Sequence, residues 1–231
     1  MAGKKRQRCI VGLAGAAIVA LCVPSAHGLS LMTDPYETQL ETWLGGDYAF
    51  TLVYDSLVDG LEARDFHANA DNMGPTITLV EVMRTQGNRH QIIGGYDPRS
   101  WDKTSGYVST PDLEDRTAFI FNLYLGTQYM QNDDPYAGQW QTLNNSVYGP
   151  TFGGGHDLLV KSIRGEAKQY SYGSGGINVF GNAGVTAFDV ARVETYTIVP
   201  VQSGEASLPE PGTAGLLGMA ILFLAVRRRR R

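Results

Sequence analysis

The chain reads Asn-Met-Gly-Pro-Thr-Ile-Thr-Leu-Val-Glu-Val-Met from Asn72 to Met83, and this stretch decides the fold. Gly74-Pro75 ends any helix before it, because proline cannot continue a helix and disfavours helical backbone at the preceding residue. From Thr76 to Met83, β-branched and apolar residues follow one another, which predicts a β-strand. A turn at 86–88 and a further apolar run at 90–94 then predict a hairpin.

The residues before this strand favour short helices. A helix is predicted over 36–44, where three large apolar residues share one face: Leu40, Trp43 and Leu44. The segment 62–70 contains good helix formers and one large apolar anchor, Phe66. Between the two, 48–54 alternates apolar and polar residues, which fits either a strand or the start of a second helix.

The residues after the hairpin predict further strands, at 118–125, 148–152, 158–163 and 188–199. The first of these is almost continuously apolar, as expected for a strand buried on both faces. In the last, strict alternation would place Arg192 and Glu194 on the side of Phe188 and Val190, with Val193 and Val199 on the opposite side.

The glycine-rich segment 171–184 predicts a loop with little side-chain packing. Few helices followed by many antiparallel strands predict an α+β fold, an antiparallel β-sandwich flanked by short helices. The globular domain is expected over 29–200, which is long enough for a single core.

The C-terminus carries a membrane-targeting pattern. After a polar linker at 201–208 come Pro209, Glu210 and Pro211, and then an apolar run over 212–226 that predicts a short transmembrane helix. Five arginines close the chain: Arg227, Arg228, Arg229, Arg230 and Arg231. Because guanidinium groups are costly to move through lipid, they should remain on the cytoplasmic side.

This tail, 209–231, resembles the PEP-CTERM sorting signal of Gram-negative bacteria. The resemblance implies that an exosortase, a membrane peptidase, cuts near Pro-Glu-Pro and passes the protein on. A precursor tethered transiently to the inner membrane and a product at the cell surface or in the extracellular matrix are therefore expected.

The N-terminus, 1–28, reads as a secretory signal peptide. Four basic residues, Lys4, Lys5, Arg6 and Arg8, precede an apolar run from Ile10 to Val23. Signal peptidase would cut after Gly28 or after Ala26. An uncleaved anchor helix is one alternative, and a lipoprotein at Cys22 is another, although Leu21 before it is bulkier than such sites usually allow.

The composition of the exported part excludes several classes of function. Between Leu29 and Pro211, ten Lys and Arg stand against 23 Asp and Glu, a net charge of −13. Such an acidic surface repels phosphate backbones, so nucleic acid is not an expected partner. Because both cysteines, Cys9 and Cys22, lie in the signal peptide, disulfides, thiolate nucleophiles and cysteine metal sites are excluded.

From Tyr36 to Ile198 the domain resembles the TLDc family. The resemblance is carried, in order, by Tyr54–Gly60, Asp65-Phe66-His67, Asp71–Val80, Gly94-Gly95-Tyr96 with Trp101, Ala118–Leu123, Tyr148–Leu158 and Val193–Tyr196. Ala70 stands where the family usually has a cysteine, which removes any redox role through that thiol. Eukaryotic relatives are associated with oxidation resistance and with the rotary proton-pumping ATPase, roles that do not transfer to an exported bacterial protein.

Four side chains could carry chemistry: His67, Asp71, His156 and Asp157. An imidazole titrates near neutral pH, so either histidine could act as a general base or a metal ligand. The alternative for His67 is a structural bond to a backbone carbonyl beside the buried Phe66. The spacing of the four matches no compact metal signature, so no metal and no cofactor are expected.

Further candidates for binding are Gly153, Gly154, Gly155, Trp101 and Trp140. Three glycines permit either a tight backbone crossing or a ligand cradle, but the Lys-Ser/Thr of a phosphate loop does not follow them. The tryptophans either anchor the core or stack on sugars. Four tyrosines in polar stretches are predicted to be exposed: Tyr129, Tyr136, Tyr170 and Tyr172.

Two functions follow from these patterns. The first is an exported, non-enzymatic binding module of the envelope or matrix, with exopolysaccharide or a matrix component as its partner. The second is a hydrolase of envelope or matrix glycans, with acids from Asp71, Asp157 or Glu81 and assistance from His67 or His156. A serine hydrolase is disfavoured, because the Gly-x-Ser-x-Gly pattern is missing from the sequence.

Overall fold

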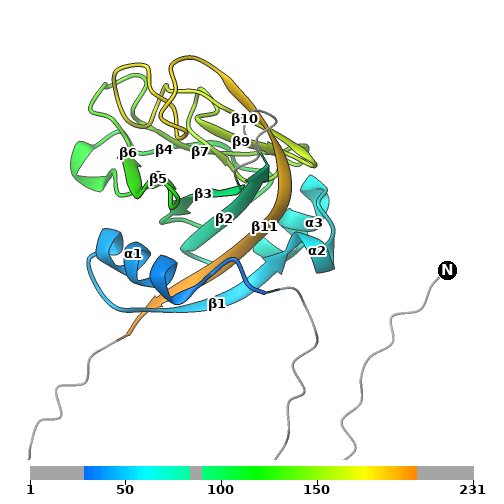
Figure 1. Ribbon diagram of the computed structural model, residues 1–231. Helices are drawn as coiled ribbons and strands as arrows, with labels where there is room; N and C mark the ends of the chain where they lie inside the picture. Colours follow the sequence, from blue (N-terminus) through cyan, green and yellow to red (C-terminus); the bar gives the residue numbers. More distant parts are fainter. Residues whose placement is uncertain (1–28, 84–89, 202–231) are drawn as a thin grey trace, which may run out of the picture. The chain divides into compact units, whose positions relative to one another are not determined.

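The computed structural model describes residues 29–83 and 90–201 of the chain (Figure 1). The predicted signal peptide 1–28, the hairpin turn at 86–88 and the sorting tail 209–231 with its helix 212–226 lie outside the described residues, as does the linker after Val201. Within these two ranges, no helix is both long and apolar enough to cross a membrane.

From Leu31 onward the described residues form one unit built on an antiparallel sheet. Its strands are β1 (Tyr48–Asp55), β2 (Thr76–Met83), β3 (His90–Asp97), β4 (Gly106–Ser109), β5 (Phe119–Asn122), β6 (Thr127–Met130), β7 (Trp140–Asn144), β8 (Thr151–Phe152), β9 (Leu158–Lys161), β10 (Arg164–Ala167) and β11 (Thr186–Pro200). Their order is β4-β7-β8-β9-β10-β11-β2-β3-β5-β6, and β1 pairs with the second half of β11.

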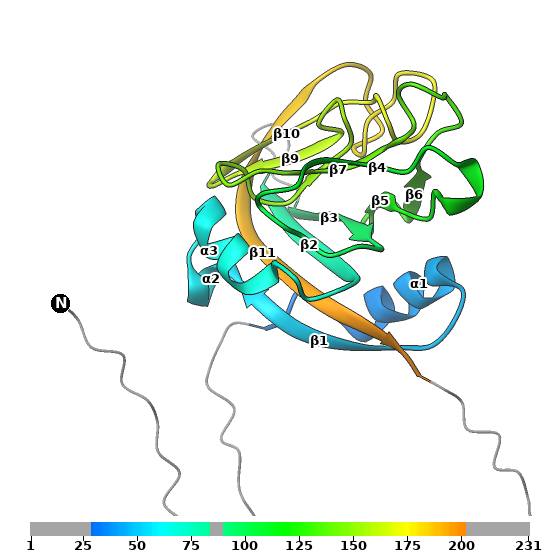
Figure 2. The ribbon, with the colours of Figure 1, turned by 180° about the vertical axis from the view of Figure 1, so that it is seen from behind.

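The long strand β11 joins two layers of this sheet. Its first residues pair with β10, and its later residues lie between β2 and β1. Figures 1 and 2 show it curving from the layer of β9 and β10 to the layer of β2 and β3, so that the sheet folds over itself. The predicted β-rich, sandwich-like arrangement with few short helices is confirmed.

The predicted alternation along β11 is wrong. A β-bulge shifts the register between Val190 and Arg192, and one extra residue moves every later side chain to the other face. Val193 therefore shares a core with Phe188 and Val190, whereas Glu194 lies on the opposite side, hydrogen-bonded to Tyr196.

Two hydrophobic cores lie on the two faces of β2. Val80 and Val82 face the core between the layers, together with Phe66 and Trp101. Ile77 and Leu79 face a second core, which α1 (Asp34–Leu44) covers with Leu40 and Trp43. This alternation explains why the strand reads as almost continuously apolar.

Residues at the helix ends set where the helices begin and end. Helix α1 ends at Gly45, whose φ of 80° suits a residue without a side chain. Helix α3 (Ala63–Ala70) begins in a capping box between Glu62 and Asp65. The sequence also missed α2 (Ser56–Asp59), which Asp55 caps by accepting from the Leu57 amide at 3.0 Å, and the 3-10 turn η1 (Leu113–Asp115).

The segment 171–184 is irregular, as predicted, but the expectation of little packing is wrong. Tyr172, Val179 and Phe180 are all buried in the core between the layers. The glycines of this segment set the backbone path, and the large side chains between them fill the interior.

Candidate functional site

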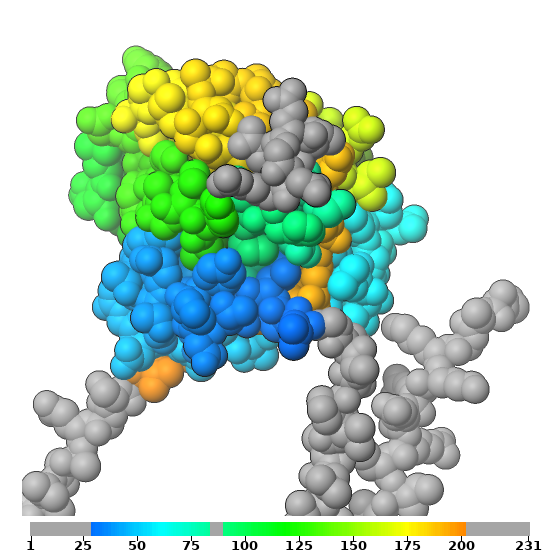
Figure 3. Space-filling view, in the orientation of Figure 1, coloured from blue at the N-terminus to red at the C-terminus, as the bar shows by residue number. Residues whose placement is uncertain are grey.

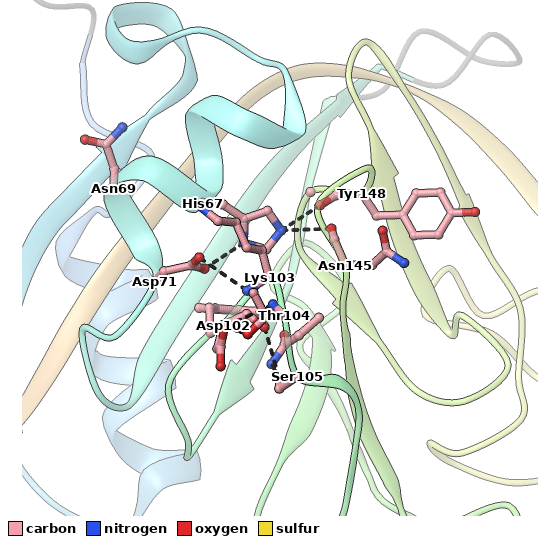
Figure 4. Close-up of polar contacts among 12 residues, drawn as sticks. His67, Asn69, Asp71, Asp102, Lys103, Thr104, Ser105, Asn145 and Tyr148 are labelled. Atoms are coloured by element: carbon pink, nitrogen blue, oxygen red, sulfur yellow. Dashed lines mark hydrogen bonds and ion pairs between the residues drawn. The ribbon is translucent and has the colours of Figure 1, made fainter.

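His67 lies at the end of α3, almost fully buried, and both of its ring nitrogens face oxygen atoms (Figure 4). Nδ1 lies 2.6 Å from Oδ1 of Asp71, one helical turn further on. Nε2 lies 3.0 Å from the carbonyl oxygens of both Asn145 and Tyr148. We call His67 and Asp71, with these partners, the His67 corner.

These contacts leave His67 without a free nitrogen for chemistry. A carboxylate oxygen faces one ring nitrogen and two carbonyl oxygens face the other, so both nitrogens are occupied by hydrogen-bond partners. The second oxygen of Asp71 accepts from the backbone amide of Lys103 at 3.3 Å. The corner therefore ties α3 to two loops, as the structural interpretation of His67 expects.

The loop 102–105 between β3 and β4, which contacts Asp71 through the Lys103 amide, is ordered by its own polar groups (Figure 4). Oδ1 of Asp102 accepts from the hydroxyl of Thr104 at 2.7 Å and from its amide at 3.0 Å. These hydrogen bonds lower the pKa of Asp102. Ser105 closes the turn by donating its hydroxyl to the Asp102 carbonyl at 3.0 Å.

Asp157 is fully buried beneath the loop that contains 171–184. Its Oδ1 accepts from the backbone amides of Tyr170, Ser171 and Tyr172 at 2.6, 2.9 and 3.0 Å, and its Oδ2 accepts from Ser171 at 3.0 Å. Burial raises the pKa of Asp157 to about 6, and the amide hydrogen bonds oppose this shift. A carboxylate that is enclosed and saturated in this way organises the loop and cannot reach a substrate.

The three glycines before His156 make room for neighbouring groups. A Cβ on Gly153 would lie 1.9 Å from Oδ2 of Asp157, one on Gly154 would lie 2.6 Å from the Trp140 ring, and one on Gly155 would lie 2.3 Å from Tyr170. The backbone therefore passes directly against other side chains. The triglycine is a close-packed crossing, and the space that a ligand cradle would need is filled.

A second buried carboxyl, Asp97, was not singled out from the sequence. It ends β3, and its Oδ1 accepts from the Arg99 amide at 2.9 Å and from the Gln141 side chain at 2.5 Å. Its Oδ2 has no hydrogen-bond partner within the described ranges, and burial raises the pKa of Asp97 to about 7. An aspartate that follows a buried strand was the only signal in the sequence.

Partly exposed rings gather beside the glycine loop. Tyr107 from β4 packs against Trp140 from β7, with ring centroids 5.6 Å apart, and stacks on His156 at 6.4 Å. His156 in turn meets the edge of Tyr148 at 5.8 Å. We call Tyr107, Trp140, Tyr148 and His156 the aromatic row. Tyr107 is 47% exposed, and the other three are half-buried.

His156 differs from His67 in being open to solvent on one side. Its Nε2 lies 3.2 Å from the Tyr107 hydroxyl, and its backbone has a φ of 61°, a left-handed conformation that is uncommon for residues other than glycine. Burial lowers the pKa of His156, and the nearby charges of Lys168 and Lys161 lower it further. The lowered pKa favours the neutral ring, which presents an aromatic surface.

The structure separates the other predicted site residues. Glu81 lies on β2 and faces His90, with Oε1 3.2 Å from Nδ1, so it belongs to neither histidine site. Trp101 is fully buried and donates to the Thr76 hydroxyl at 2.9 Å, which makes it a core residue with no surface for sugar. Trp140 alone of the two tryptophan candidates reaches the surface region.

The predicted exposure of Tyr172 is wrong, because its ring is buried and its hydroxyl donates to the Gln141 carbonyl at 2.7 Å. Tyr136 and Tyr170 are exposed, as predicted, and Tyr129 is half-buried.

The four predicted polar residues form no single cluster. Among residues 29–83 and 90–201, no group of three or more His, Cys, Asp or Glu side chains could hold a metal ion. His67 and Asp71 form one pair, Asp157 lies under a loop, and His156 belongs to the aromatic row. Sequence reasoning missed Tyr107 and Tyr148 as members of that row; Tyr148 opens the block Tyr148–Leu158, whereas nothing in the sequence marks Tyr107.

Two comparisons bear on this arrangement. A family model described as the TLDc domain matches residues 27–199. The search of curated proteins found no match for the chain.

Proposed function

Since the chain belongs to the TLDc domain family, we propose that it is an exported binding module of the bacterial envelope or extracellular matrix, with a glycan as its partner. This proposal rests on a contrast within the domain. Two of the polar groups that the hydrolase hypothesis named, His67 and Asp157, are buried and hydrogen-bonded, whereas the aromatic row remains accessible.

The single observation that carries the proposal is the composition of the aromatic row. Four rings form a chain of contacts, Trp140 to Tyr107 to His156 to Tyr148, with successive centroids 5.6, 6.4 and 5.8 Å apart. Flat, partly exposed rings offer apolar surface at low cost in side-chain entropy, and Tyr and Trp also carry a polar tip. Sugar rings have apolar C–H faces and hydroxyl edges, and such a row complements both.

Export and sorting are part of the same proposal. The N-terminal pattern 1–28 would direct secretion, and the tail 209–231 would be the substrate of an exosortase-type peptidase. Replacement of Glu210 by Ala should leave precursor in the inner membrane, detectable by its mass and by protease treatment of spheroplasts. Release of the variant at the normal rate would contradict sorting through this motif.

Binding is tested by titrating the purified full-length protein with exopolysaccharide from the producing cells. We expect saturable binding with no change in the chain length of the polysaccharide, as measured by size-exclusion chromatography. Shortened chains would contradict a pure binding role and would support the glycan hydrolase that the sequence left open. Absence of binding would contradict the glycan as partner.

A further inference from the structure

Free positive charge is concentrated on one hairpin of this acidic domain. Three of the eight Lys and Arg side chains in the described ranges lie on or directly after the hairpin of β9 and β10: Lys161, Arg164 and Lys168. No carboxylate oxygen of the described residues lies within 4.0 Å of their charged nitrogens, whereas Arg192 is buried in an ion pair with Asp55. Figure 3 shows the yellow-green atoms of this part of the chain at the surface.

The same hairpin borders a groove of about 250 Å³. Its lining includes Lys161, Arg164, Gly165, Glu166, Phe188 and Asp189. The Phe188 ring packs directly on Gly165, where a Cβ would lie 2.3 Å from the ring, so these two residues form a close-packed part of the groove's lining. Its volume is below the roughly 300–1,000 Å³ of pockets for drug-sized ligands, so it suits one unit of a polymer.

Lys161 links the groove to the aromatic row. Nζ of Lys161 lies 4.8 Å from the centre of the Tyr148 ring, and Lys161 also lines the groove. Arg164 faces Lys161 across the β9–β10 pairing and Asp189 across the β10–β11 pairing. A polymer that follows the row would therefore reach Lys161 first and Arg164 next.

The charges of the groove are mixed, and the mixture selects a chemistry. Arg164 can hold a carboxylate with two parallel hydrogen bonds, and Lys161 adds a point charge. Glu166 and Asp189 can only accept hydrogen bonds when ionised, which suits the hydroxyl groups of a sugar. The same two carboxylates repel any anion, so the groove suits a ligand with a single carboxylate per unit better than the closely spaced charges of a polyphosphate.

We propose that this groove binds a uronate unit of an acidic glycan, while the neighbouring sugars stack along the aromatic row. The inference rests on the proposed function and narrows its ligand to glycans that carry carboxylates. The remaining acidic surface does not prevent this, because charges more than about 10 Å away are largely screened at 0.1 M salt.

The test compares two forms of one ligand, oligogalacturonate and its fully methyl-esterified, neutral form. Full-length protein should bind the acid at least tenfold more tightly than the ester at 0.1 M salt. Arg164→Ala should abolish most of this preference. Arg64→Ala removes the same charge from an exposed site on α3 and should leave the preference unchanged. Arg164→Lys, which keeps the charge but loses the fork, should fall between Arg164→Ala and the parent protein.

The outcomes separate the two levels of the proposal. Equal affinity for the acid and the ester would overturn the uronate groove and leave glycan binding intact, whereas no affinity for either would count against both. Loss of preference in Arg64→Ala to the same extent as in Arg164→Ala would reduce the effect to net charge. Tighter, Arg164-dependent binding to phosphatidylglycerol vesicles than to oligogalacturonate would replace the glycan by a membrane surface.

Discussion

The His67 corner and the aromatic row lie on either side of one residue, Tyr148, and use histidine in opposite ways. The backbone carbonyl of Tyr148 accepts from buried His67, and its ring packs against half-exposed His156. In the corner every polar atom of the imidazole has a partner. In the row the rings keep open surface. The contrast shows that a histidine in a family motif can have a structural role, while the accessible side chains lie on the other side of a residue that it contacts.

The largest effect is expected from Asp157, which belongs to the buried side of this comparison. Asp157→Ala leaves three backbone amides without an acceptor, and we expect it to lower the free energy of unfolding by about 4 kcal/mol. Urea denaturation measures this loss. Asp133→Ala, at an exposed site, is the control and should change stability by less than about 0.5 kcal/mol. A small loss at Asp157 would mean that the carboxylate does not order the loop.

His67→Ala tests the corner itself. Removing the ring leaves Asp71 and two carbonyls without their donor, at a cost of about 3 kcal/mol in stability. Because no ring nitrogen is free, the affinity of the folded fraction for glycan should stay within about twofold, or about 0.4 kcal/mol. His90→Ala, at an exposed site, should alter neither quantity. A stable His67→Ala protein that had lost glycan binding would move the site to the corner.

Asp97, which is also buried, makes the stability of the folded protein depend on pH. Burial raises its pKa to about 7, so above about pH 4 the native state holds a proton that the unfolded state has lost. The contribution of Asp97 to the free energy of unfolding is fully present below the pKa that it has in the unfolded state. It is lost as pH rises through about 7, at up to about 1.4 kcal/mol per pH unit.

Asp97→Asn keeps the accepting oxygen and cannot ionise. It should therefore be more stable than the parent protein by about 1–3 kcal/mol at pH 8, and the two should converge below pH 4. Denaturation at a series of pH values measures the difference between them. A difference that did not vary with pH would show that Asp97 ionises normally in the fold.

The smallest effect on stability is expected in the aromatic row. Tyr107→Ala removes an exposed ring, so the free energy of unfolding should change by less than about 1 kcal/mol. The affinity for glycan should fall about tenfold, which corresponds to about 1.4 kcal/mol. Tyr136→Ala, at a more exposed tyrosine outside the row, is the matched control. Equal losses of affinity in both variants would contradict a localised site.

His156→Asn sharpens the same comparison. Asparagine tolerates the left-handed backbone at this position better than histidine does, so the fold should be retained. The ring is lost, and affinity should fall by several-fold as for Tyr107. Unchanged affinity in a binding assay would exclude His156 from the ligand surface.

Long, regular elements could be predicted from the sequence because their pattern repeats. Strand β2 and helices α1 and α3 extend over eight or more residues, and their predicted limits agree with the structure within two residues. Strands β4, β6, β7 and β10 have four or five residues of mixed polarity and were missed, because so few residues cannot establish a period. The equally short β5 and β9 were found because they are almost entirely apolar.

The prediction of which residues share a face of β11 was wrong for a different reason. A single bulge after Val190 reverses all later side chains, and nothing local marks it. The candidate site divides in the same way. The pair of His67 and Asp71 is local, at one helical turn, whereas Tyr107 and His156 meet only through the pairing of strands far apart in the sequence.

Tryptophan fluorescence tests the central claim most directly, because Trp140 belongs to the row while Trp43 and Trp101 pack in the two cores. Titration of the full-length protein with oligogalacturonate should change its emission. That change should disappear in Trp140→Phe and persist in Trp43→Phe. A signal that survives in Trp140→Phe, or that is lost in Trp43→Phe, would contradict binding at the aromatic row.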